Sequence, residues 1–130
     1  MTEYYSTCYS TCLVIDDNYI DNLVTRRLLE ICNFAKSIIL NESPTDAIES
    51  LRSGTVVPDV IFLDIRMPIM DGFEFMQEFE KLDISKSNIK IYLLSSSLDP
   101  ADVQRSSDNG YITQLIHKPL TKQILEGISL

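Results

Sequence analysis

Carboxylates, hydroxyls and one lysine follow short apolar runs in this 130-residue sequence. Asp64 ends the run that begins at Val60, within the stretch VIFLDIRMPIMDG. A buried carboxylate without a partner costs several kcal/mol or loses its charge, so we expect Asp64 at the open end of a strand. The other polar groups that follow such runs are the acidic pair Asp16 and Asp17, the serines Ser95, Ser96 and Ser97, and Lys118 before Pro119.

These residue types are suited to holding a metal ion and a phosphoryl group. Three carboxylates in one cluster repel one another, and they stay ionised when a hard divalent cation lies among them. Mg²⁺ fits, because it accepts one or two carboxylates, keeps several waters and favours a phosphate oxygen as a further ligand. The alternative is that Asp16 and Asp17 merely cap a following helix, which the addition of Asp64 and a lysine disfavours.

The elements that must position these groups are parallel strands alternating with helices. Apolar runs rich in β-branched residues alternate with amphipathic segments, as is typical of βα units. Each run is uniformly apolar, as expected for a strand buried on both faces. Strands are predicted at residues 12–15, 37–40, 60–63, 90–94 and 113–116. Ligands of such sheets bind beyond the carboxyl ends of the strands, where the polar groups fall.

Helix-start signals lie between these strands. Three of them are recognisable caps, namely Ser43-Pro44, Asp99-Pro100 and the capping box of Asp71 with Glu74. Helices are predicted at 19–32, from 44 onward, at 72–82, at 101–110 and at 120–130. The segment 101–110 is rich in weak helix formers, which predicts a labile helix. The inner face of the first helix is assigned to its spaced apolar residues, Ile20, Leu23, Val24, Leu28 and Ile31.

Composition favours one globular domain at residues 12–130, preceded by an extension at 1–11 without a helical or strand period. No apolar stretch approaches the length of a membrane span and no signal peptide opens the chain, so we expect a cytoplasmic protein without membrane insertion. The net charge of −8 disfavours direct nucleic-acid binding. The cysteines form no CxxC pair, which favours reduced thiols over a metal site.

Four motifs in combination resemble the receiver domains of two-component response regulators. VIDDN contains the acidic pair, LDIRMPIMDG contains Asp64, LLSSS contains the serines, and HKP contains the lysine. The resemblance covers the chain from Cys12 onward. It implies an α/β fold of the flavodoxin-like, CheY-like kind, a doubly wound (βα)5 unit whose five parallel strands have the order 2-1-3-4-5. That order places the first and third strands side by side, which brings the three aspartates together.

The resemblance also implies roles for the residues at the acidic cluster. Asp64 would be the phosphoacceptor, Asp17 a direct Mg²⁺ ligand, and Asp16 a residue that acts mainly through water. The backbone carbonyl of Arg66 would be a further metal ligand. Lys118 would bind a phosphoryl oxygen, and the peptide bond after it is expected to be cis.

Further roles concern the fourth and fifth strands. Ser95 stands at the position of the switch hydroxyl of the family, while Ser96, Ser97 and Arg66 are candidate modulators of phosphoryl lifetime. Many receivers carry an aromatic residue where this chain has Leu115, so coupling to the output surface is expected to use an aliphatic side chain or to be weaker. The single histidine, His117, is expected to be packed or at the surface rather than catalytic.

The predicted function is that of a single-domain response regulator. It would accept a phosphoryl group on Asp64 from a sensor histidine kinase or a phosphotransfer protein, and then switch a surface that contacts a downstream protein target. It would catalyse its own phosphorylation and dephosphorylation without turning over a metabolite, so no enzyme is predicted. One alternative is a Mg²⁺-dependent phosphatase with an aspartyl nucleophile, although Arg66 occupies the place of its second aspartate. The other is a scaffold that is not phosphorylated.

Overall fold

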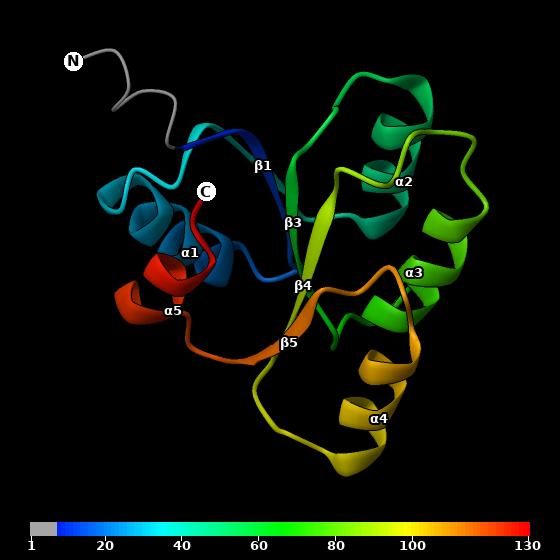
Figure 1. Cartoon of the computed structure of the whole chain (residues 1–130). Coiled ribbons are helices and arrows are strands. Elements are labelled where there is room, and N and C mark those ends of the chain that lie inside the picture. The colour runs from blue at the N-terminus through cyan, green and yellow to red at the C-terminus, as the bar shows by residue number, and fades with distance from the viewer. Residues whose placement is uncertain (1–7) are drawn as a thin grey trace.

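The computed structural model describes residues 8–130, and within them five strands alternate with five helices (Figure 1). The strands are β1 Tyr9–Ile15, β2 Ala35–Asn41, β3 Val60–Asp64, β4 Lys90–Ser95 and β5 Gln114–His117. The helices are α1 Tyr19–Ile31, α2 Pro44–Ser53, α3 Gly72–Glu80, α4 Pro100–Asp108 and α5 Lys122–Ile128.

The strands form one parallel sheet in the order β2-β1-β3-β4-β5, which confirms the predicted fold and strand order. Ile15 of β1 pairs with Leu63 of β3, so these two central strands end side by side. Helices α1 and α5 cover one face of the sheet, and α2, α3 and α4 cover the other (Figure 1). Two apolar clusters fill the space between the sheet and its helices, one on each face.

The predicted helix caps are present. The side chains of Ser43 and Asp99 accept hydrogen bonds from the first turns of α2 and α4, and a proline follows each of them. Asp71 and Glu74 form the reciprocal capping box of α3. The sequence therefore predicts the starts of α2, α3 and α4 correctly, because a helix cap depends on residues that lie close together in the sequence.

The bounds of several elements differ from the predicted ones by a few residues. Strand β1 begins at Tyr9 rather than Cys12, because Tyr9 and Thr11 pair with residues 35 and 37 of β2. On the other edge, the carboxylate of Asp59 accepts hydrogen bonds from the backbone N–H groups of Ser10 and Thr11. Part of the predicted extension thus belongs to the sheet, while residues 1–7 lie outside the described part of the chain. Helices α3, α4 and α5 end earlier than predicted.

The predicted inner face of α1 is wrong. Ile20 and Val24 are 63% and 61% exposed, and the buried residues of the helix are Asn22 and Leu29. The amide of Asn22 donates a hydrogen bond of 2.7 Å to the backbone carbonyl of Asp16, which turns this polar residue inward. Of the apolar residues assigned to the inner face, only Leu28 packs against the core cluster. The remaining apolar side chains consequently face outward.

Candidate functional site

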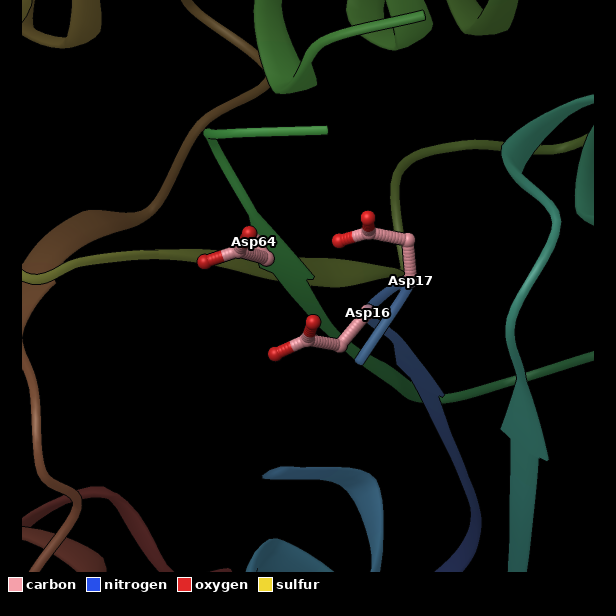
Figure 2. A group of neighbouring side chains, drawn as sticks. All are labelled: Asp16, Asp17 and Asp64. Carbon is pink, nitrogen blue, oxygen red and sulfur yellow. The ribbon is translucent and has the colours of Figure 1, made fainter. Parts of the chain in front are cut away.

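Three aspartates meet where β1 and β3 end. Asp64 is the last residue of β3, and Asp16 and Asp17 follow β1 directly. One carboxylate oxygen from each residue lies within 4.8 Å of the others. Figure 2 shows the three side chains extending from neighbouring strand ends, as the strand order predicted. Asp16 and Asp64 are buried, whereas Asp17 is exposed.

Lys118 brings a positive charge from the end of β5 to this cluster. Its Nζ lies 2.8 Å from Oδ1 of Asp64, 3.1 Å from Oδ2 of Asp16 and 3.5 Å from Oδ2 of Asp21. The peptide bond between Lys118 and Pro119 is cis, as expected. One ammonium group therefore faces more carboxylates than it can neutralise.

The surplus of negative charge affects both partners of the central ion pair. Burial raises the pKa of Asp64, the hydrogen bond from Lys118 opposes this rise, and repulsion by Asp16 and Asp17 adds to it. For Lys118, burial alone would lower the pKa, but the carboxylates of Asp64 and Asp16 more than offset it and raise the pKa. The pKa values of Asp64 and Lys118 are both raised, because a cluster with net negative charge favours a proton on each of its groups.

The cluster has the donor set that a hard divalent cation requires. Its ligand atoms are carboxylate oxygens, and the excess negative charge is what a second cation would neutralise. One carboxylate oxygen of Asp16 is already engaged with the backbone N–H of Asn18 at 2.9 Å, and the other with Lys118. The arrangement thus leaves Asp17 and Asp64 with more freedom than Asp16 to bind a metal directly.

The serines lie at the end of β4, next to the cluster. Ser95 is buried, and its hydroxyl donates a hydrogen bond to the carbonyl of Ser97 while accepting one of 3.2 Å from the backbone N–H of Ser97. The hydroxyl is therefore engaged within its own loop. His117 is exposed and lies 3.1 Å from the carbonyl of Ser96, as expected for a surface histidine. Leu115 is half-buried against the core.

Three residues at the site were not singled out from the sequence. Asn22 supports the backbone of Asp16, and its side-chain oxygen has no hydrogen-bond partner among the described residues. Asp102 on α4 is buried and forms an ion pair with Arg66. A Cβ on Gly72 would lie 3.0 Å from the carbonyl oxygen of Asp64, so only glycine lets α3 start this close to the site.

The sequence signals for these residues were weak. Asn22 stands on a helix whose apolar residues suggested another face, and Asp102 looks like an ordinary first-turn acidic residue. Gly72 follows Asp71 in a dipeptide that is common in turns. Only the tertiary structure shows what each of them contacts.

Comparison with known proteins places this geometry in a family. The family model of the response regulator receiver domain matches residues 12–128. This chain belongs to that family. It is 27% identical to the chemotaxis protein CheY of Halobacterium salinarum, in a match that covers 90% of this chain and 91% of CheY. It is 30% identical, over 89% of its length, to 14% of the sensor histidine kinase CheAY of Helicobacter pylori.

A solved structure supports the same assignment. A response regulator receiver protein from Dyadobacter fermentans superposes with a TM-score of 0.82 at 31% identity, and the match covers 92% of this chain and 94% of the Dyadobacter chain. This chain spans between 14% and 39% of the length of three curated relatives that it matches. None of these comparisons supports the phosphatase or the scaffold alternative. No helix in residues 8–130 is long and apolar enough to cross a membrane.

Proposed function

We propose that this receiver domain accepts a phosphoryl group on Asp64 from the phosphohistidine of a sensor histidine kinase or a phosphotransfer protein. The observation that carries the proposal is the 2.8 Å contact between the Lys118 ammonium and Asp64 inside a cluster of carboxylates. A carboxylate can attack phosphorus when nearby cations neutralise the negative charge of the phosphoryl oxygens. Lys118 supplies one such charge, and the cluster has the ligands for a second.

The reaction exchanges one phosphorus bond for another. An oxygen of Asp64 forms a bond to phosphorus, the bond between phosphorus and the donor imidazole nitrogen breaks, and the electron pair leaves with the imidazole. Lys118 binds a phosphoryl oxygen in place of part of its present contact with Asp64. Water later cleaves the acyl phosphate, which returns the carboxylate and inorganic phosphate. The chain therefore turns over no metabolite in this proposal.

Mg²⁺ is the cation proposed for the cluster. Asp17 and Asp64 would bind it directly, Asp16 through water, and the backbone carbonyl of Arg66 would add a ligand. When bound, it supplies positive charge that neutralises the carboxylates and the phosphoryl oxygens. This chain's own residues fix the carboxylates by strand pairing and hold Asp16 through Asn22 and Asn18.

The outward face of α1 supports a helical protein as the phosphoryl donor. Ile20, Leu23 and Val24 are exposed large apolar residues of α1, the helix that follows Asp16 and Asp17 in the chain. Val24 also lines a cavity that reaches Lys118 and Pro119. An amphipathic helix that carries an exposed histidine could bury these side chains and present its imidazole to Asp64. A net charge of −8 disfavours nucleic acid as a direct partner, so we propose a protein as the downstream target.

We also propose the extent of the receiver unit, the roles of the residues around Asp64 and the cellular compartment. Residues 12–130 would make up the receiver unit, with residues 1–11 as an extension whose last three residues, 9–11, lengthen β1. Ser95 would donate its hydroxyl to a phosphoryl oxygen, with Ser96, Ser97 and Arg66 as modulators of phosphoryl lifetime. The cytoplasm is proposed as the compartment, because the reduced thiols of Cys12 and Cys32 fit a reducing environment.

The proposal is tested by labelling with acetyl phosphate, with and without Mg²⁺, followed by intact mass measurement. We expect one added phosphoryl group that requires Mg²⁺ and is absent from Asp64→Asn. Repeated release of phosphate from unrelated phosphomonoesters would instead indicate a phosphatase. A mass that never changes with donor and metal in excess would contradict the proposal and favour a scaffold.

A further inference from the structure

An ion pair joins helix α4 to the loop of residues 65–71, which follows Asp64 and is called the phosphorylation loop below. The guanidinium of Arg66, two residues after Asp64, lies 2.5 Å from Oδ2 of Asp102 in the first turn of α4. The Arg66 side chain is 57% exposed, but that of Asp102 is only 8% exposed. The cation is therefore free to leave toward solvent, whereas the anion is fixed in the protein.

Asp102 depends on this cation. Within residues 8–130, Arg66 is the one basic residue that forms an ion pair with Asp102. The backbone carbonyl of Asp102 accepts a hydrogen bond of 2.9 Å from the hydroxyl of Ser106, one turn later in α4. Because a buried carboxylate without a cation is costly, loss of Arg66 would destabilise the first turn of α4 in its present position.

Arg66 is also within reach of a phosphoryl group on Asp64. The Cα atoms of residues two apart are at most about 7.6 Å from each other, and an arginine side chain spans a comparable distance. A phosphoryl group carries about −1.5 to −2 charges and three strong acceptor oxygens, which a guanidinium binds with two parallel hydrogen bonds. Phosphorylated Asp64 would therefore compete with Asp102 for the same guanidinium.

We propose that Arg66 and Asp102 form a latch that reports the phosphorylation of Asp64 to helix α4. This inference rests on the proposed function of Asp64. In the unphosphorylated protein the guanidinium binds Asp102 and holds the first turn of α4. After phosphorylation the guanidinium binds phosphoryl oxygens, and the buried Asp102 is left without its cation. The first turn of α4 then opens or moves until Asp102 reaches water.

The other contacts of α4 direct this movement to its N-terminal half. Toward its C-terminal end, the guanidinium of Arg105 lies 4.0 Å from the centre of the Phe73 ring on α3, and Asn109 donates a hydrogen bond of 3.1 Å to Glu80. Neither contact involves the phosphorylation loop. The C-terminal half of α4 is thus held to α3 by contacts that phosphorylation leaves alone, and the N-terminal half is held by the latch.

The latch is measured by amide hydrogen exchange of residues 101–108, with and without beryllofluoride and Mg²⁺ as a mimic of the phosphorylated state. In the wild type we expect the mimic to speed exchange in the first turn by about three- to tenfold, the range set by a charged hydrogen bond whose cation is half exposed. Arg66→Gln should show the faster exchange without the mimic and little further change with it. Asp102→Asn should also lose the response to the mimic, but it should keep the slow exchange of the unphosphorylated wild type, since it leaves no buried charge without a cation.

Arg105→Gln is the matched control. It removes an exposed cation from α4 that contacts Phe73 rather than Asp102. We expect faster exchange toward the C-terminal end of α4 and an unchanged response of the first turn to the mimic. If Arg66→Gln responds to the mimic as fully as the wild type does, the latch is refuted.

Failure of the latch differs from failure of the proposed function. Intact mass measurement after acetyl phosphate treatment reports phosphorylation itself, and Asp102→Asn, which lies on α4 outside the acidic cluster, is expected to gain a phosphoryl group. A wild-type protein that gains none would overturn the proposed function and the latch with it. A phosphorylated wild type whose first turn of α4 exchanges at an unchanged rate would overturn the latch alone.

Discussion

Asp64→Asn is expected to stabilise the protein when no divalent cation is present. Asp64 is 6% exposed and stands in a cluster with two other carboxylates. At an effective dielectric constant of about 20, two unit charges 4.8 Å apart repel by about 3.5 kcal/mol, so Asp16 and Asp17 together contribute about 7 kcal/mol. At 2.8 Å, Lys118 attracts Asp64 by about 6 kcal/mol on the same scale.

The balance of these contributions favours the neutral amide. Removing the charge removes about 1 kcal/mol of net repulsion, and the cost of burying a carboxylate disappears as well. Asparagine keeps the shape and can still accept a hydrogen bond from Lys118. We therefore expect Asp64→Asn to raise the free energy of unfolding in EDTA by about 1 to 2 kcal/mol, which corresponds to about 4 to 7 °C in Tm for a chain of this size.

Urea unfolding in EDTA and in Mg²⁺ measures this effect. Excess Mg²⁺ should stabilise the wild type, by about 2.7 kcal/mol at a concentration 100 times Kd, and should stabilise Asp64→Asn less because one anionic ligand is gone. The difference in the free energy of unfolding between Asp64→Asn and the wild type should therefore shrink or change sign in Mg²⁺. Asp21→Asn is the matched control, since this exposed carboxylate is 3.5 Å from Lys118 and its removal should change stability by at most about 0.5 kcal/mol.

One result would refute this reasoning. If Asp64→Asn in EDTA is less stable than the wild type by more than about 1 kcal/mol, Asp64 contributes to a favourable ion-pair network. The cluster would then be a structural feature that requires no second cation.

Three further predictions follow from the site. In EDTA the free energy of unfolding of the wild type should fall relative to Asp64→Asn as pH rises from about 4 through the raised pKa of folded Asp64, because the folded state binds that proton more tightly; urea unfolding at a series of pH values checks this. Ile20→Lys should slow phosphoryl transfer from a phosphohistidine protein by tenfold or more, and labelling by acetyl phosphate far less. Asn22→Ala should cost about 1 to 3 kcal/mol in urea unfolding and weaken Mg²⁺ affinity, since it frees the backbone of Asp16; equal affinity would mean that Asn22 is only a packing residue.

The strands and the positions of the acidic residues were predictable from the sequence. Strands buried on both faces are uniformly apolar, so a polar residue such as Asp64 marks the strand end directly. The helix caps at Ser43 and Asp71 were predictable for a similar reason, because the donor and acceptor lie within one turn of each other. The meeting of Asp64 with Asp16 needed the strand order, which the family resemblance supplied.

The orientation of α1 was not predictable from its pattern. A hydrophobic stripe predicts the buried face only when burial in the core is the reason for its hydrophobicity. On α1 the apolar residues Ile20 and Val24 are exposed, and the inward position belongs to Asn22, which serves the backbone of Asp16. A helix that contacts both a polar site and a protein partner can place its polar residue inside and its apolar residues outside.

The pairing of Arg66 with Asp102 also lay beyond sequence reasoning, since 36 residues separate the two and no local pattern links them. Its energy bounds what the latch can do. Exchanging one charged hydrogen bond whose cation is half exposed changes the ratio of two states by about three- to tenfold. Converting a population from 1:99 to 99:1 needs about 10⁴-fold. The latch alone would therefore shift the position of α4 only in part, and the aliphatic Leu115, at the place of the usual aromatic residue, is expected to add little coupling. The binding of a target to the moved α4 would have to supply the rest of the free energy.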